Sequence, residues 1–294
     1  MPELPDLELY LDALRARVEG RVLRGLRIES PFLLRSVDPP PQELAGRRLE
    51  GLERLGKRLV LAFEGDLFAV LHLMIAGRLR WSAPGAALPA RLGQAAFDFD
   101  EGSLVLTEAG TKRRASLHLV RSRAGLAEHA RGGLEPLECT PAAFAERLGA
   151  ENHTLKRALT DPRLFSGIGN AYSDEILHAA RLSPMQWTRN LSAEEVARLH
   201  RAVVDTLATW RARLIAEGGG RWPAKVTAFR PGMAVHGRFR QPCPVCGTAV
   251  QRIVWAENEC NYCPRCQTGG KLLADRALSR LLKKSWPRSI DELP

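Results

Sequence analysis

The first residues of the chain have the chemistry of a nucleophile with a proton carrier beside it. The sequence begins Met1-Pro2-Glu3, and methionine is usually removed before a small residue. Pro2 would then carry a free secondary amine, and α-amino groups have a reference pKa of about 7.7–8.0. Such an amine can attack a carbonyl-like carbon and form a Schiff base, while Glu3 moves protons. The same residues also fit a stiff, inert leader before a helix.

Four cysteines near the end of the chain have the spacing of a metal site. Cys243 and Cys246 form one C-x-x-C pair, Cys263 and Cys266 form another, and 16 residues separate the two pairs. Two such pairs can place four thiolates around one tetrahedral Zn²⁺, and four sulfur ligands leave no open position for catalysis. We therefore predict one structural zinc, with free or redox-active cysteines as the alternative. The remaining two cysteines fall outside this pattern: Cys139 and Cys260.

A glycine-rich break at residues 167–170 could bind a phosphate group. Its sequence is Gly-Ile-Gly-Asn, and a helix is predicted directly after it. Glycines before a helix leave backbone N–H groups free to hold an anion, and Lys156 and Arg157 on the preceding helix would add positive charge. A plain joint between two helices fits this pattern equally well.

Composition and charge narrow the class of protein. The 294 residues are enough for two domains, and 45% of them are hydrophobic. The chain lacks an apolar stretch of about 20 residues and an N-terminal secretory pattern, so we expect a cytoplasmic protein without membrane contact. The net charge of +10 favours a polyanionic partner, with nucleic acid first and an anionic membrane surface second.

The elements that would position these residues are strands first and helices afterwards. Leucines at helical spacing follow Asp6, which could cap that helix. Residues 58–63 with 67–71, and 96–100 with 103–106, have the pattern of hairpins in a β-sandwich. Beyond about residue 131 the pattern is helical, with a capping box at Ser192 and Glu195 before a long amphipathic helix. Hairpin character returns between the two cysteine pairs.

These patterns predict an α+β chain built from several parts. The parts are an N-terminal β-sandwich, a helical domain, a four-cysteine zinc ribbon and a C-terminal extension, at residues 1–130, 131–238, 239–272 and 273–294. In the extension, three leucines and a pair of lysines suggest a short basic helix: Leu278, Leu281, Leu282, Lys283 and Lys284.

The motifs together resemble one family. A Pro-Glu-Leu-Pro start, the Gly-Ile-Gly-Asn break, a Val-His-Gly-Arg stretch at 235–238 and the four-cysteine finger occur in this order. Over about residues 2–272 the chain is similar to the formamidopyrimidine-DNA glycosylase/endonuclease VIII family. The resemblance implies a helix–two-turn–helix domain beside the sandwich, with duplex DNA held in a cleft between them. Members of the family excise oxidised bases and cut the strand at the abasic site.

The resemblance also implies roles for individual residues. Pro2 would attack C1′ of the sugar of a flipped nucleotide, Glu3 would move protons, and Lys57 matches the catalytic lysine of the family. Lys156 and Asn170 match phosphate contacts, which position DNA without reading its sequence. We expect further positive charge along the DNA site from three arginines: Arg113, Arg114 and Arg252.

The sequence departs from the family pattern where DNA would be probed. After His72-Leu73 many relatives have Gly-Met, whereas this chain has Met74-Ile75, so either residue could fill the gap left by the flipped nucleotide. The Arg-Arg-Phe-Gly loop of the 8-oxoguanine branch is represented by Arg113-Arg114 without the Phe. At the finger tip, Asn258 occupies the usual Arg position.

We therefore expect a monomeric DNA repair glycosylase with AP lyase activity that acts on duplex DNA carrying damaged bases or abasic sites. Two other functions fit parts of the sequence. A catalytically silent DNA-binding protein of the same fold would not need Pro2, Glu3 and Lys57 together. A zinc-ribbon RNA-binding protein would explain the charge and the finger, but not the N-terminus.

Overall fold

A computed structural model describes the chain from Met1 to Pro294, apart from residues 111, 256–257, 276–279, 282–286 and 293–294. The chain divides into two compact units. The first unit contains Met1–Arg131 and Trp210–Ala228, and the second contains Gly132–Thr209 and Phe229–Pro294. The long helix α6 (Ala193–Gly218) therefore contributes residues to both units.

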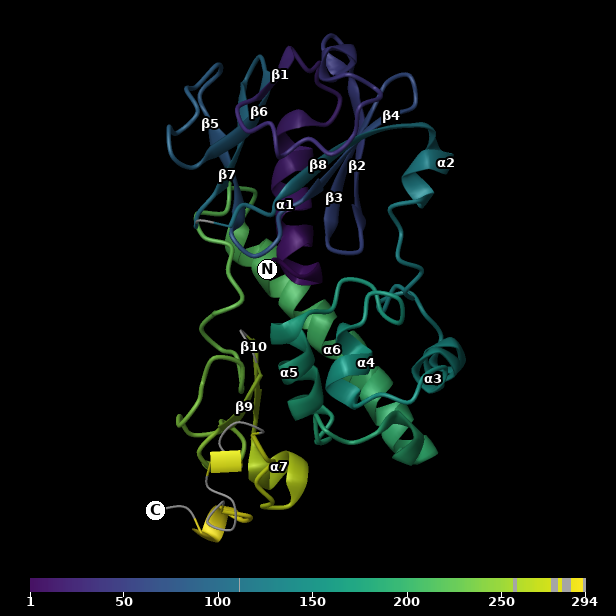
Figure 1. The fold of residues 1–294 in the computed structure, drawn as a ribbon, viewed down its shortest axis with the longest axis vertical. Helices are drawn as coiled ribbons and strands as arrows, with labels where there is room; N and C mark the ends of the chain where they lie inside the picture. The colour runs from purple at the N-terminus through teal and green to yellow at the C-terminus, as the bar shows by residue number, and fades with distance from the viewer. Residues whose placement is uncertain (111, 256–257, 276–279, 282–286, 293–294) are drawn as a thin grey trace. The chain divides into compact units, whose positions relative to one another are not determined.

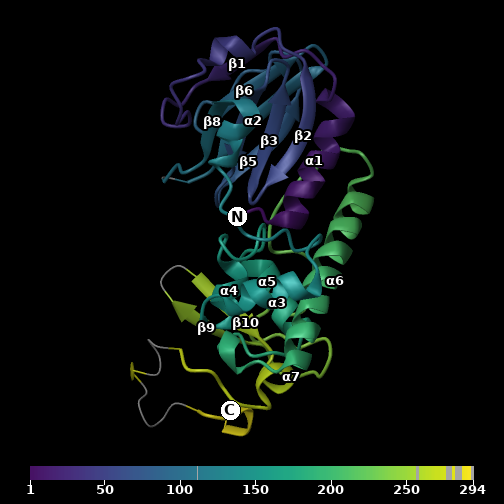
Figure 2. The same ribbon diagram turned by 90° about the vertical axis from the view of Figure 1, so that its right-hand side faces the viewer.

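The first unit is the predicted β-sandwich (Figures 1 and 2). Among its described residues, one antiparallel sheet has the strand order β1-β6-β7-β5, with these bounds: β1 Gly25–Ile28, β6 Gly93–Phe99, β7 Gly102–Glu108 and β5 Gly77–Ser82. The other has the order β2-β3-β4-β8, with these bounds: β2 Leu49–Leu55, β3 Arg58–Phe63, β4 Leu67–His72 and β8 Ser116–Arg121. Both predicted hairpins, β3–β4 and β6–β7, are present.

Besides the last part of α6, three helical elements of the described residues belong to this unit: α1 Leu4–Val18, α2 Ser122–Ala127 and the 3₁₀ turn η1 Pro41–Leu44. Helix α1 packs along β2 and β3, and its leucine stripe is buried. The helix begins at Leu4, earlier than the predicted start after Asp6. Glu3 is the N-cap: its carboxylate accepts from the N3 backbone, and Asp6 accepts from the Glu3 backbone N–H at 3.0 Å. Both carboxylates thus satisfy N–H groups that the first turn leaves open.

In its described residues the second unit is helical, with one small hairpin. Its helices cover the following ranges: α3 Pro141–Gly149, α4 Leu155–Thr160, α5 Asn170–Ala179, the first part of α6, α7 Pro264–Thr268, and the 3₁₀ turns η2 Thr188–Asn190 and η4 Ile290–Glu292. The predicted capping box opens α6, because the Ser192 N–H donates to the Glu195 carboxylate at 2.9 Å and the Glu195 N–H donates back at 3.2 Å. Helix α5 packs against α4, α7 and the hairpin strand β10.

The hairpin consists of β9 (Gln251–Trp255) and β10 (Asn258–Tyr262), paired antiparallel. The predicted basic helix of the C-terminal extension lies mostly outside the described residues, since Leu278, Leu282, Lys283 and Lys284 are among those not described. The described part folds back on the finger: the Leu272 N–H donates to the Arg288 carbonyl and the Ile290 N–H donates to the Gly270 carbonyl, both at 2.9 Å.

Candidate active site and metal centre

The N-terminal residues are packed into the first unit. Pro2 is buried, Glu3 is 3% exposed, and Met1 is 38% exposed. The pKa of the Met1 amino group lies below its ordinary value, chiefly because burial removes its hydration. Glu3 opposes this lowering, whereas Arg78 and Lys57 add to it. An amine at this place therefore loses its proton more readily than one in water.

Lys57 acts electrostatically on this terminus and also on His72. Lys57 follows Gly56, whose φ of +62° makes the tight turn between β2 and β3. Arg58 and His72 are direct partners across β3 and β4. Burial lowers the pKa of His72 to about 4, with Arg58 and then Lys57 adding repulsion. The structure thus gathers the predicted catalytic residues Pro2, Glu3 and Lys57 at one end of the sandwich, together with a neutral histidine.

The turn after β4 holds both residues that could fill a DNA gap. Ile75 is 58% exposed, whereas Met74 is half-buried and has a φ of +50°. That backbone region suits glycine, which many relatives have here, so Met74 holds a strained conformation. Gly77 closes the turn by donating its N–H to the Leu73 carbonyl at 2.9 Å, and a Cβ at residue 77 would meet that oxygen at 2.2 Å. Ile75 is therefore the apolar tip of the turn.

The basic pair between β7 and β8 is anchored by a buried carboxylate. Glu108 is 2% exposed and accepts from the backbone N–H groups of Arg114, at 2.8 Å, and Ala115, at 3.1 Å. Both arginine side chains are exposed, and Arg113 donates to the Arg91 carbonyl at 2.6 Å. Ala115 is 4% exposed, so this loop has no apolar wedge at the position of the family Phe.

Lys156, which the family resemblance matches to a phosphate contact, lies inside the second unit. The residue is 5% exposed. Its ammonium donates to the Asn170 carbonyl at 2.6 Å, to Ser173 Oγ at 2.8 Å and to the Asp174 carboxylate at 2.5 Å. Three donors are thus satisfied by the protein. The charge is buried because Asp174 is buried beside it.

Asp174 is the centre of a wider network. Its second oxygen accepts from the Asn261 N–H of β10 at 3.1 Å and lies 2.8 Å from His236 Nδ1. Burial opposes ionisation of Asp174, but Lys156 and His236 hold its pKa below the ordinary value. Four segments therefore meet at one buried carboxylate: α4, α5, the loop before the finger and β10.

Two neighbouring residues fix the start of α5 and the loop at 234–236. Glu175 accepts from the backbone N–H groups of Ala234, Val235 and His236 at 2.6–2.9 Å. Burial raises its pKa although these bonds favour the charged form. Asn170, the first residue of α5, donates from Nδ2 to the Glu259 carbonyl of β10 at 2.8 Å.

Arg252 lies on the hairpin. Its guanidinium is 3.2 Å from the Glu259 carboxylate and lies over the Phe239 ring, 4.3 Å from the centroid. Arg240 lies over the same ring at 5.2 Å. Cation–π contacts leave the outer edge of a guanidinium available to an anion.

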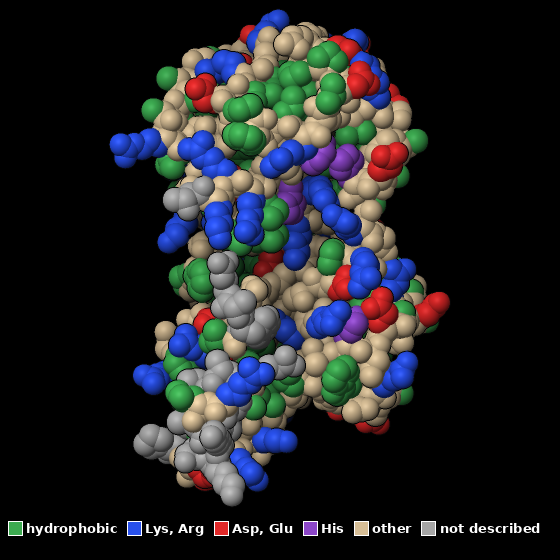
Figure 3. Space-filling view, viewed as in Figure 1, with side chains coloured by type: hydrophobic (Ala, Val, Ile, Leu, Met, Phe, Trp, Pro, Cys, Tyr) green, Lys and Arg blue, Asp and Glu red, His purple; other side chains and the backbone are tan. Residues whose placement is uncertain are grey.

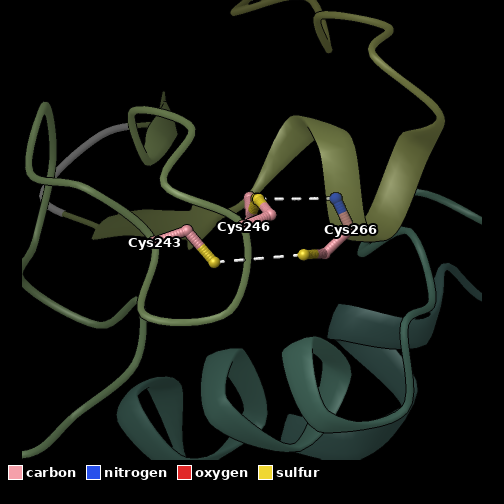
Figure 4. Close-up of side chains that lie close together, drawn as sticks. Cys243, Cys246 and Cys266 are labelled. Carbon is pink, nitrogen blue, oxygen red and sulfur yellow. Dashed lines mark hydrogen bonds between the residues drawn. The ribbon is translucent and has the colours of Figure 1, made fainter.

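The four predicted cysteines converge, and Figure 4 shows the sulfurs of Cys243 and Cys266 facing each other. All four sulfurs lie within 4.8 Å of one another. The separations are 3.9 Å for Cys243–Cys266 and 3.4 Å for Cys246–Cys263. Tetrahedral Zn²⁺ with Zn–S bonds of about 2.3 Å requires sulfurs about 3.8 Å apart, so the set fits zinc.

A histidine from α5 supports this metal centre. His178 Nε2 lies 3.2 Å from Cys243 Sγ, and a hydrogen bond to a ligand sulfur orients it and tempers its charge. Cys260 is 1% exposed, and burial raises the pKa of its thiol well above the ordinary value, as expected for a bystander.

Comparisons with known proteins agree with this architecture. Three sequence models match consecutive parts of the chain: the formamidopyrimidine-DNA glycosylase N-terminal domain at residues 1–116, the H2TH domain of the same enzyme at 133–213, and a zinc finger found in FPG and IleRS at 240–269. The formamidopyrimidine-DNA glycosylase of Chloroflexus aggregans is 34% identical over 280 residues, covering 91% of this chain and 98% of the relative. The chain belongs to the formamidopyrimidine-DNA glycosylase family. The Thermus thermophilus member is also 34% identical, over 92% of this chain and its own full length.

Solved structures of the family share the fold. A Lactococcus lactis FPG mutant bound to Fapy-dG DNA has a TM-score of 0.79 at 23% identity, covering 91% of this chain and all of the other. MutM in complex with DNA containing carbocyclic 8-oxo-G has the same TM-score at 24% identity. The family and α+β fold predictions are thus confirmed, and with them one structural zinc at the four cysteines. Among the described residues, no helix is long and apolar enough to cross a membrane.

Several residues of the site were not found by sequence reasoning. The sequence assigns no role to Asp174, and it marks His236 only within the Val-His-Gly-Arg motif; both belong to the network beneath the Gly-Ile-Gly-Asn break, together with Glu175. His178 lies one helical turn after Asp174 in α5, and nothing in the sequence marks it as a neighbour of the cysteines. The sequence marks His72 only as part of the stretch before Met74.

Proposed function

We propose that this chain excises oxidised bases from duplex DNA and then cuts the strand through a Schiff base formed by Pro2. The glycosylase and AP lyase activities and the damaged-DNA partner follow from membership of the formamidopyrimidine-DNA glycosylase family. The residue roles are our proposal. The observation that carries it is the position of Pro2, which is buried next to Glu3 at a chain terminus on which Lys57 acts electrostatically.

The chemistry begins after Met1 is removed. The Pro2 nitrogen attacks C1′, the bond from C1′ to the base breaks, and the base leaves with that electron pair. Glu3 passes a proton during opening of the sugar ring. The resulting Schiff base draws electrons from C2′, whose proton is lost as the 3′ phosphate is eliminated. Glu3 is well suited to this role because the N-cap geometry holds its backbone in one place.

Lys57 is proposed to hold a phosphate next to the reacting sugar. It occupies a tight turn, it acts electrostatically on the terminal amine, and its positive charge helps to keep that amine neutral. Ile75 is proposed as the apolar side chain that fills the space left by the flipped nucleotide, because it is the exposed tip of its turn. Arg113, Arg114 and Arg252 are proposed to contact DNA.

In the second unit we propose that Asn170 contacts a phosphate, whereas Lys156 positions Asn170. The ammonium of Lys156 holds the Asn170 carbonyl and the first turn of α5. This arrangement fixes the helix N-terminus, whose N–H groups favour an anion. We also propose that the chain works in the bacterial cytoplasm, because the relatives named above are bacterial.

Borohydride trapping tests the nucleophile. Wild-type protein is incubated with a duplex carrying an abasic site, reduced, digested and analysed by mass spectrometry. The cross-linked peptide is expected to begin at Pro2. A variant with one Gly inserted before Pro2 has an amide at that nitrogen and should form no covalent complex, while Glu3→Gln should bind damaged DNA and lose base excision. A cross-link at an internal lysine would refute the assignment.

A further inference from the structure

One face of the β2-β3-β4-β8 sheet changes from apolar to basic along its strands. Near α2 this face is a core cluster: Val60, Phe68, Val70, Val120 and Leu126. Two residues farther along the same strands, the side chains on this face are Arg58, His72 and His118, because alternate residues share a face. Figure 3 shows histidine side chains among Lys and Arg side chains over these strands, in the upper part of the view.

Arg58 and His118 both contact His129, which lies two residues after the end of α2. Arg58 Nη1 donates to the His129 carbonyl at 3.1 Å, and the rings of His118 and His129 meet edge to face with centroids 4.7 Å apart. Arg58 Nε and His118 Nδ1 are buried without a hydrogen-bond partner. Across the described part of the chain, no salt bridge joins these three residues to a carboxylate.

Buried polar atoms without partners cost free energy, so their presence requires a reason. The Arg58 guanidinium acts electrostatically on both imidazoles, so the three groups lie close together and offer several N–H donors. Phosphate matches this donor set, because Arg binds phosphate through parallel hydrogen bonds. We propose that Arg58, His118 and His129 form a phosphate-binding subsite, distinct from Lys57, that takes a backbone phosphate of DNA. The identity of the phosphate as DNA rests on the proposed function.

The subsite should take up protons when it is filled. Burial first, and then the neighbouring positive charges, lower the pKa of both His118 and His129 in the free protein. The positive groups that act on them are Arg35, Arg58 and the partner imidazole, and Glu128 is the acidic group that acts on His129. A phosphate would reverse this balance and raise both pKa values. Affinity should therefore increase as the pH falls, by up to about tenfold per pH unit for each histidine that takes a proton.

The test measures binding of a fluorescent duplex with a tetrahydrofuran abasic analogue by anisotropy, over salt concentrations of about 50–200 mM. Arg58→Met should make the slope of log affinity against log salt less steep by about 0.9. The loss of affinity between the lowest and the highest salt concentration should then be smaller by a factor of about 3.5. Arg24→Gln is the matched control, since it removes one charge from an exposed ion pair with Asp100 in the same unit. The control should keep the wild-type slope.

The histidines are tested by pH. His118→Gln and His129→Gln should match wild type at about pH 8 and bind more weakly than wild type at about pH 6. A structural role for Arg58 would instead lower the melting temperature of Arg58→Met, whereas an uncompensated cation predicts an unchanged or higher value. Unchanged salt slopes with parallel pH profiles would overturn the proposal.

Inorganic phosphate distinguishes the source of the ligand. Phosphate added without DNA should shift the NMR signals of His118 and His129 only weakly, because a single free phosphate lacks the other contacts of a duplex. Saturation of these signals by phosphate at concentrations that leave DNA binding unchanged would contradict a DNA subsite. If wild-type trapping at Pro2 fails while the Arg58→Met slope still falls, the proposed nucleophile is wrong and the subsite stands.

Discussion

Acid is expected to destabilise the first unit through His72. Its pKa is about 4, because burial and then the charge of Arg58 oppose protonation. An unfolded histidine has a pKa of about 6.5, so between these values the unfolded chain binds a proton that the folded chain excludes. The stabilising contribution is therefore complete above about pH 6.5 and is lost as the pH falls toward about 4.

The magnitude follows from the two pKa values. Relative to about pH 8, linkage gives a loss of about 2 kcal/mol at about pH 5 and about 3 kcal/mol at about pH 4. Domains are stable by only about 5–15 kcal/mol, so this loss is a large part of the total. His72→Gln removes the titrating group while keeping a polar side chain of similar size, and it should remove this part of the pH dependence.

The assay compares wild type with His72→Gln at about pH 8 and pH 5, using hydrogen exchange of peptides from β3 and β4. Any loss of zinc in acid affects both proteins and cancels in the difference. Between about pH 8 and pH 5, the free energy of unfolding of the wild type should fall by about 2 kcal/mol more than that of the variant. Titration of ¹³C-labelled histidine gives the pKa directly. The reasoning would be refuted if the stability difference between wild type and variant were equal at both pH values, or if the pKa of His72 were near 6.5.

Three further predictions concern the metal, the buried network and the DNA site. His178→Phe should speed zinc release to a colorimetric chelator and weaken zinc affinity about 10–100-fold, because it removes the hydrogen bond to Cys243; an unchanged release rate would show that the bond is unimportant. Asp174→Asn should cost about 3–5 kcal/mol of stability, measured by urea unfolding, because Lys156 stays buried without its counter-charge; a loss below about 1 kcal/mol would contradict this. The single-turnover rates of cleavage of one oxidised base opposite each of the four bases should differ by less than about tenfold, because the loop lacks an apolar wedge after Arg114. A preference of about a hundredfold that disappears in Arg114→Ala would show instead that Arg114 recognises the opposite base.

The strongest sequence signals were those that depend on local spacing. The paired cysteines predicted their own cluster, and alternation predicted the hairpins, because both patterns are fixed by neighbours along the chain. The start of α1 was misplaced because Glu3 and Asp6 cap the helix reciprocally, and either carboxylate alone fits the N-cap position.

Long-range partners could not be predicted in the same way. Lys156 was expected to face DNA, since a lysine beside a glycine-rich break usually remains solvated. Its burial depends on Asp174, whose second oxygen is in turn held by residues more than 60 positions away. The Arg58–His118–His129 subsite likewise appears only when β3, β4 and β8 are placed in register.

The Asp174 network has a consequence for exchanging parts between proteins. A zinc finger is commonly regarded as a separable module, and the matching finger also occurs in IleRS. Here the hairpin supplies the Asn261 N–H to Asp174, and α5 supplies His178 to a zinc ligand, so each part completes the other. A transplanted finger without that donor would leave a lone pair of a buried carboxylate unsatisfied inside the helical unit. Recombination should therefore succeed only when finger and α5 are inherited as one block.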